Sequence, residues 1–244
     1  MTPDELEELI KQRLERFYER RIANLTQVQL FDVLKRKNPY LLRAIGISSA
    51  AQLVEIVLQQ HIMASDETLF GTEFIEPVAL AVSGGKKSSA EGIDIEVEGE
   101  ISYKAISVKS GPNIFNSSQA KKMNEQFEEL RRRLQQYLRQ TRKQFDPILG
   151  AAYGKRNLPA RGKRSYRHVA GQAFWQELTG DPDFYLKVIR LMKDYPEQHR
   201  RVFEQEMDKA KNRFARDLLN QFAEADGTLS WEKLLKYNSG GNNE

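Results

Sequence analysis

The chain has 244 residues, of which 40% are hydrophobic and 30% are charged, with a net charge of +4 and no cysteine. This length is enough for one sizeable hydrophobic core or two small ones. No apolar run approaches the roughly 20 residues that span a membrane, and the acidic N-terminus lacks the pattern of a secretory signal. The lack of cysteine excludes disulfides and thiolate zinc sites. We therefore expect a soluble, cytoplasmic protein without a membrane partner.

The first third of the chain has the apolar periodicity of helices. Hydrophobic residues recur every three or four positions, as on one face of a helix. This pattern occurs in four segments, at about residues 4–22, 26–35, 50–62 and 69–82. Pro77 lies inside the last segment, so we expect that helix either to be kinked or to begin late. Residues 1–82 are therefore predicted to be mainly helical.

A β-hairpin is predicted after the Gly84-Gly85 pair. From Gly92 to Val108, apolar and polar residues alternate on both sides of a turn at residues 98–100, which is the period of a half-buried strand. The apolar segment 147–154 contains glycines and has the character of a buried strand. Between them, residues 119–144 are predicted to form a long charged helix.

The rest of the chain is predicted to be a basic loop at residues 155–168 followed by helices. These helices are expected at about residues 169–179, 181–193, 196–225 and 230–236. We therefore expect one α/β domain over residues 1–237, with a sheet core at 83–154 and the basic loop and last helices at 155–237. Residues 238–244 are predicted to be a disordered tail.

Asp94 and Lys109 lie at the two ends of the predicted hairpin. An inward-facing aspartate at the start of a strand is unfavourable unless it is paired or binds a metal. The ends of an antiparallel pair can bring a carboxylate and an ammonium group together at one edge of a sheet. Taken alone, this pair is more simply explained as a salt bridge or as solvated charges, because short motifs often match by chance.

The residues around this pair resemble those of a known nuclease superfamily. Lys109-Ser110-Gly111-Pro112-Asn113 is followed by Asn116-Ser117-Ser118-Gln119, and Ser88-Ser89-Ala90-Glu91-Gly92-Ile93 precedes Asp94. In this order of helix, two strands, helix and strand, the chain resembles the PD-(D/E)XK nucleases. More closely, it resembles a PmeII-like group of type II restriction endonucleases. Further similar segments are at residues 37–44, 67–71 and 171–175, so that the resemblance covers about residues 35–195.

The resemblance implies a small mixed sheet flanked by helices, in a restriction-endonuclease-like three-layer core with helical N- and C-terminal segments. It also implies Mg²⁺-dependent hydrolysis of double-stranded DNA at a specific short sequence, which leaves 5′-phosphate and 3′-hydroxyl ends. A homodimer is expected, because twofold symmetry matches a palindromic site. Two alternatives stay open: a structure-specific or repair nuclease, and a DNA-binding protein whose nuclease site has decayed.

The metal site that the resemblance implies departs from the superfamily pattern at one position. The residue two before the lysine is usually acidic, but here it is Ser107, and serine is a poor Mg²⁺ ligand. Asp94, the carbonyl of Val108 and a glutamate from elsewhere are expected to hold one or two ions. Three glutamates are candidates, in the order Glu76, Glu125 and Glu73.

The remaining catalytic roles are expected to fall on two residues. Lys109 is expected to orient or help deprotonate the attacking water and to stabilise the charged phosphate in the transition state. Gln119 is expected either to position Lys109 or contact the DNA backbone, or simply to cap the following helix.

Polar and basic residues in two loops are candidate DNA contacts, because such side chains pair with phosphates and read base edges. One loop precedes Asp94 and the other follows the predicted strand at 147–154. The candidates are Lys86, Lys87, Ser88, Ser89, Arg161, Lys163, Arg164 and Arg167. Asn113 and Asn116 are further candidates, although turn formation explains both equally well. Tyr153 ends the predicted strand, and its position favours neither a core role nor a DNA contact.

Overall fold

The structure is a computed structural model that describes residues 1–111 and 117–240. These residues form two compact units. Unit 1 consists of residues 1–17 and 68–195, and unit 2 consists of residues 18–67 and the described residues after 195. Each unit has its own hydrophobic core. That the two units act together as a single domain over residues 1–237 stays a prediction.

Unit 1 contains a five-stranded mixed sheet in the order β1-β2-β3-β4-β5. The strands are β1 (Lys86–Lys87), β2 (Ile95–Glu98), β3 (Ser102–Lys109), β4 (Gln144–Ala151) and β5 (Arg167–Ala170). The first three strands are antiparallel neighbours, whereas β3, β4 and β5 are parallel. The predicted hairpin and mixed sheet are therefore confirmed. The assignment of residues 167 and 168 to a loop, and of 169 and 170 to a helix, was wrong, because they form β5.

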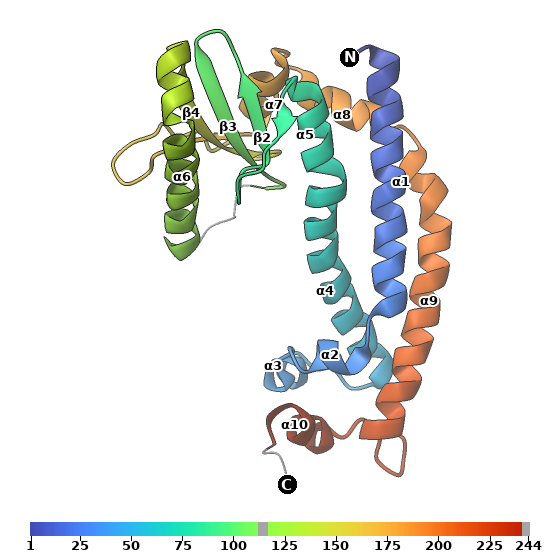
Figure 1. The fold of residues 1–244 in the computed structure, drawn as a ribbon. Coiled ribbons are helices and arrows are strands. Elements are labelled where there is room, and N and C mark those ends of the chain that lie inside the picture. The colour runs from blue at the N-terminus through green and yellow to red at the C-terminus, as the bar shows by residue number, and fades with distance from the viewer. Residues whose placement is uncertain (112–116, 241–244) are drawn as a thin grey trace. The chain divides into compact units, whose positions relative to one another are not determined.

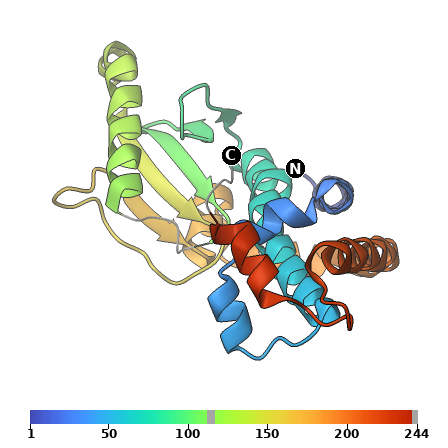
Figure 2. The ribbon, with the colours of Figure 1, turned by 90° about the horizontal axis from the view of Figure 1, so that it is seen from below.

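Helices cover both faces of this sheet and make the expected three layers (Figures 1 and 2). The flanking helices are α5 (Glu76–Ser83), α6 (Ser117–Thr141), α7 (Gln172–Thr179) and α8 (Phe184–Met192). Successive side chains of a strand point to opposite faces. Accordingly Ile106 of β3 packs in the cluster that contains α5 and α7, whereas Ala105 packs with Phe127 of α6. The α/β restriction-endonuclease-like fold is confirmed.

Gly150 in β4 allows α7 to approach the sheet closely. A Cβ atom at this position would lie 2.2 Å from a ring carbon of Phe174. Phe174 is fully buried and its neighbour Trp175 is 3% exposed. The Trp175 indole Nε1–H also donates to the carbonyl of Ala152 at 2.9 Å. Both aromatic residues are therefore part of the core that supports β4.

Unit 2 is helical. It contains α2 (Leu30–Leu34), α3 (Pro39–Ala44) and α10 (Trp231–Ser239), together with most of α4 (Ala50–Phe70) and α9 (Tyr195–Phe222) and the last part of α1 (Pro3–Gln27). The core combines leucines of α4 with phenylalanines of α9. The predicted disordered tail began too early, because Asn238 lies in α10 and its amide donates to the carbonyls of Leu34 and Lys37. In the described part of the chain, no helix is long and apolar enough to cross a membrane.

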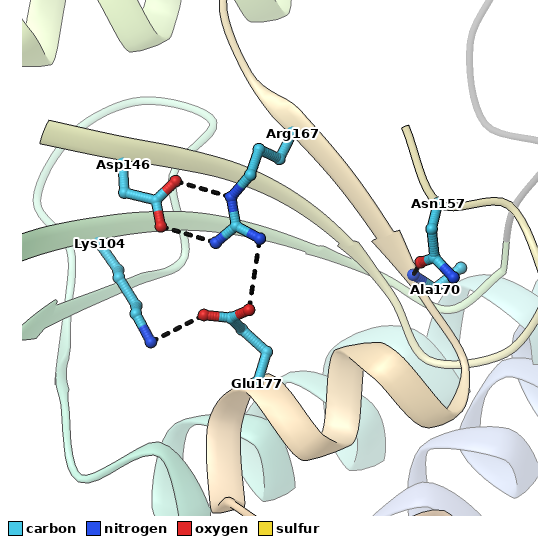
Figure 3. A network of polar contacts seen from close by, with 6 residues as sticks. All are labelled: Lys104, Asp146, Asn157, Arg167, Ala170 and Glu177. Carbon is cyan, nitrogen blue, oxygen red and sulfur yellow. Dashed lines mark hydrogen bonds and ion pairs between the residues drawn. The ribbon is translucent and has the colours of Figure 1, made fainter. Parts of the chain in front are cut away.

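An ion-pair network connects three strands of unit 1 to α7 (Figure 3). Arg167 of β5 donates two hydrogen bonds to Asp146 of β4, at 2.9 and 2.6 Å, and a longer one to Glu177 of α7 at 3.3 Å. Lys104 of β3 lies 2.7 Å from the other oxygen of Glu177. Two positive and two negative groups alternate here, so each half-buried charge has a partner.

We predict that Glu177→Gln destabilises the protein at neutral pH by about 2 kcal/mol, the magnitude of hydrogen bonds to charged groups. Burial raises the pKa of Glu177, but the hydrogen bonds from Lys104 and Arg167 outweigh it and hold this pKa below the usual range. The stabilisation is therefore present at neutral pH and is lost as the pH falls through that lowered pKa. Urea denaturation at several pH values measures it.

Glu128→Gln is the matched control, because Glu128 pairs with Arg131 at 3.8 Å in an exposed i,i+3 ion pair. This substitution should change the free energy of unfolding by less than about 1 kcal/mol. Equal effects of the two substitutions at neutral pH would contradict a stabilising role for the network.

Candidate active site

Asp94 is held in place by the ends of two strands. Its backbone N–H donates to the carbonyl of Ile106 at 2.9 Å, and its carbonyl accepts from the N–H of Ser88 at 3.0 Å. Its carboxylate accepts a hydrogen bond from the backbone N–H of Val108 at 2.6 Å. Lys109 Nζ lies 4.0 Å from the same carboxylate oxygen. Asp94 and Lys109 therefore lie together at one edge of the sheet, as predicted.

Glu76 is positioned by an irregular turn of helix. Residues Gly71–Ile75 form a π-helical turn between α4 and α5, and the N–H of Glu76 bonds to the carbonyl of Gly71. Pro77, which lacks an N–H, follows in the first turn of α5, where it is tolerated. The expected distortion near Pro77 is thus a π-helical turn, a feature that is frequent at functional sites.

Two half-buried carboxylates, Asp94 and Glu76, have perturbed ionisation at this edge of the sheet. Burial and the negative charge of Asp94 raise the pKa of Glu76, whereas Lys109 and Lys87 oppose this change. Burial also raises the pKa of Asp94, against the effects of Lys109, the Val108 N–H, Ser107 and Lys87. Lys87 of β1 therefore belongs to this group electrostatically. Both acids are less easily ionised than in water, which is the arrangement that a bound cation would reverse.

Ser107 lies beside Asp94 but offers little as a ligand. Its side chain is fully buried. Its hydroxyl opposes the rise that burial causes in the pKa of the Asp94 carboxyl. It has no hydrogen-bond partner of ordinary geometry within the described residues. Ser107 therefore supports Asp94 rather than supplying the missing carboxylate.

The residues at this edge fit a divalent cation. In a strand, the N–H and the carbonyl of one residue point to the same side, so the carbonyl of Val108 points toward the side on which Asp94 accepts its N–H. Two carboxylates and one carbonyl are oxygen ligands of the kind that Mg²⁺ takes together with water and phosphate. Among the described residues, no group of three or more acidic, histidine or cysteine side chains could hold a metal.

The other two candidate glutamates have partners elsewhere. Glu73 lies 3.6 Å from Arg16. Glu125 is exposed on α6, where it lies 3.8 Å from Lys121 in an i,i+4 pair. Gln119 is exposed in the first turn of α6. None of these three is among the groups that affect the pKa of Asp94 or Glu76.

The residues of the loop before Asp94 differ in their surroundings. Ser88 donates its hydroxyl to Glu96 at 2.5 Å, and Lys86 lies 3.9 Å from the same carboxylate. Ser89 is exposed, as is Lys87. Only Lys87 acts on the acidic pair, so this loop brings one positive charge to the candidate active site.

The second basic loop forms a hairpin-like arm between β4 and β5, which extends beyond α6 in both views (Figures 1 and 2). The backbones of Arg161 and Arg164 form an antiparallel β-bridge across its tip. The residues Arg161 and Lys163 are exposed there. The guanidinium of Arg164 donates to the carbonyl of Pro159 at 2.6 Å and holds the arm together. Arg167 is occupied by Asp146 and Glu177. The predicted contacts Asn113 and Asn116 lie outside the described residues.

Glu96 is a buried carboxylate that the sequence interpretation passed over. It is 7% exposed and accepts hydrogen bonds from Ser88 and from the Tyr103 hydroxyl. The signal for it was available, because Asp94 and Glu96 are two residues apart and therefore share one face of the sheet. Through these hydrogen bonds Glu96 connects Ser88, in the segment before Asp94, to Tyr103 of β3, and so supports the position of Asp94.

A family model described as Type II restriction endonuclease EcoO109I matches residues 4–199, a range that includes Glu76, Asp94 and Lys109. A search of curated proteins finds no match. The family match confirms the resemblance to type II restriction endonucleases, whereas the closer likeness to the PmeII-like group stays a prediction.

We predict that Glu76→Gln makes the metal-free protein more stable at pH 7. The raised pKa of Glu76 means that ionisation is less favourable in the folded protein than in the unfolded chain, so stability falls as the pH rises through that pKa. The difference from the wild type should disappear below the ordinary glutamate value of 4.5. Denaturation in a chelator measures it. Glu73→Gln, which removes a charge paired with Arg16, should not stabilise the protein.

Proposed function

Because residues 4–199 match its model, the chain belongs to the type II restriction endonuclease EcoO109I family, and we propose that Asp94, Glu76 and Lys109 form its active site. The protein is thus a type II site-specific deoxyribonuclease whose substrate is DNA. Enzymes of this class generally use divalent metal ions. We propose Mg²⁺ as the ion, and 5′-phosphate and 3′-hydroxyl ends as the products.

One observation carries the site assignment: the half-buried Glu76 lies close enough to Asp94 for the charge of Asp94 to raise its pKa, with a lysine at 4.0 Å from Asp94. Without a cation this arrangement is unfavourable, because burial disfavours both negative charges. A structural ion pair would be more stable with one carboxylate than with two. The incomplete compensation of the two half-buried carboxylates therefore favours a cation site over a simple salt bridge.

In the proposed reaction, Asp94, Glu76 and the Val108 carbonyl would hold Mg²⁺. The ion would neutralise charge that develops on the phosphate and lower the pKa of a bound water. Lys109 would orient or help deprotonate the attacking water and donate to a phosphate oxygen.

DNA binding is proposed to use positive side chains at two places in unit 1. Lys87 lies beside the acidic pair and would contact the phosphate that is cut or its neighbour. Arg161 and Lys163 are exposed at the tip of the arm between β4 and β5, where they would pair with more distant phosphates or read base edges. We further propose a homodimer, because two copies related by a twofold axis match the two halves of a palindromic site.

We predict that Lys109→Ala lowers the rate of DNA cleavage at least about a hundredfold, the usual effect of removing a general acid–base group or a transition-state donor. Digestion of a sequenced phage DNA with Mg²⁺, followed by mapping of the ends, gives the rate, the cut site and the end chemistry together. Discrete fragments support a restriction endonuclease. Branch-dependent cutting would indicate a repair nuclease, and binding without cutting a decayed site. A Lys109→Ala variant that cuts at the wild-type rate would overturn the site assignment.

A set of three substitutions identifies the glutamate that completes the metal site. We predict that Glu76→Gln raises the Mg²⁺ concentration needed for half-maximal cleavage more than about tenfold, since even groups that only support a ligand commonly have effects of this size. Glu125→Gln and Glu73→Gln should leave it within about twofold, because both residues pair with basic side chains elsewhere. If Glu125→Gln has the largest effect, the ligand comes from α6 instead.

A further inference from the structure

Tyr153 lies at the same end of the sheet as Lys109. Lys109 and Ala151 are register partners in β3 and β4, and the N–H of Ala152 donates to the carbonyl of Lys109 at 2.9 Å. Tyr153 is the next residue after Ala152. Because this pairing fixes the two strand ends side by side, Tyr153 starts from a backbone position next to the proposed catalytic lysine.

The ring of Tyr153 lies against Gly111, two residues after Lys109. A Cβ atom at Gly111 would lie 2.5 Å from the Tyr153 hydroxyl oxygen and 2.6 Å from the ring carbon that bears it. Any side chain at position 111 would therefore push the end of this ring away. Because Gly111 has no side chain, the Tyr153 hydroxyl can lie beside the backbone that follows β3.

The hydroxyl of Tyr153 differs from those of three other tyrosines in unit 1. Tyr103, Tyr137 and Tyr195 have hydroxyls that donate to carboxylates. Within residues 1–111 and 117–240, Tyr153 has no hydrogen-bond partner of this kind, and its side chain is 56% exposed. A single exposed aromatic residue is ordinary on a protein surface. Tyr153 therefore combines an exposed hydroxyl donor that no carboxylate accepts with close packing against Gly111, just after β3 ends.

The nearby charges suit an anion. Lys109 precedes Gly111 by two residues, and the exposed Lys155 and Arg156 follow Tyr153 in the chain. Tyrosine hydroxyls are among the neutral donors that bind DNA phosphates. The Tyr153 hydroxyl, beside Gly111, is thus offset from Lys109 by two residues of chain, as a contact to a neighbouring phosphate requires.

We propose that Tyr153 is a substrate-contact residue, whose hydroxyl donates a hydrogen bond to the DNA phosphate next to the one that is cut. This inference rests on the proposed function, because it takes Lys109 to be at the cleaved phosphate. Gly111 is the positioning residue, since the absence of its side chain determines where the hydroxyl lies.

Tyr153→Phe tests this directly, because it keeps the ring against Gly111 and removes only the hydroxyl. The probe is a duplex that carries the mapped cut site, with Ca²⁺ in place of Mg²⁺ so that binding is measured without cutting. We expect the Kd to rise about tenfold, as for the loss of one hydrogen bond to a charged group. The salt dependence of the Kd should not change, because a neutral hydroxyl displaces no counterion. Tyr40→Phe, at a 68% exposed tyrosine of α3, should leave the Kd unchanged.

Gly111→Ala supplies a second, independent variant. It should displace the Tyr153 ring and weaken DNA binding by a similar factor. In a Tyr153→Phe background it should add little, because both changes remove the same contact. Multiplied losses in the double variant would overturn the positioning role of Gly111. Thermal denaturation of each variant identifies any general loss of folding.

The outcomes separate this inference from the function on which it rests. If the wild type cuts DNA, Lys109→Ala does not, and Tyr153→Phe binds as tightly as the wild type, then only the role of Tyr153 is overturned. If Lys109→Ala cuts at the wild-type rate, the proposed site fails, and the role of Tyr153 fails with it.

Discussion

The hydrogen bond from the Val108 N–H to the Asp94 carboxylate, at 2.6 Å, is the contact on which the rest of the site depends. It uses a backbone donor of β3 at the point where β2 has not yet begun, so that an aspartate side chain takes the place of a strand partner. With this orientation of Val108, its carbonyl also points toward Asp94, and Lys109 is the next residue of the strand. Strand pairing, the position of the proposed metal ligands and the position of the Lys109 ammonium group thus share one origin.

The electrostatics of the site follow from this placement. Asp94 cannot move away from Glu76, because its backbone is bonded to both Ile106 and Ser88. Burial then makes the two negative charges unfavourable, and Lys109 and Lys87 compensate only in part. In a family of DNA-cutting enzymes, this incomplete compensation favours the proposed binding of a divalent ion before the polyanionic substrate arrives.

Features that depend on residues close together in the chain could be predicted from the sequence, whereas features that depend on distant segments could not. The Asp94–Lys109 hairpin is local and mostly alternating, so its period showed both strands and the edge where they meet. β5 is a four-residue parallel edge strand that begins with Arg167 and His168, which is too short and polar for any period to appear. The division into two units was hidden because each unit combines segments far apart in the chain. Glu76 was chosen by resemblance, and its approach to Asp94 required the tertiary structure.

The π-helical turn at Gly71–Ile75 makes the position of Glu76, in the proposed active site, sensitive to chain length. A π-helical turn contains one residue more than the corresponding α-helical turn, and each residue of an α-helix is rotated by about 100° from the one before it. Deletion of one residue here would therefore restore a regular helix and turn Glu76 to a different face, with no change in the identity of any active-site residue. In evolutionary terms, a single codon in this segment separates a helix that delivers its carboxylate to Asp94 from one that does not.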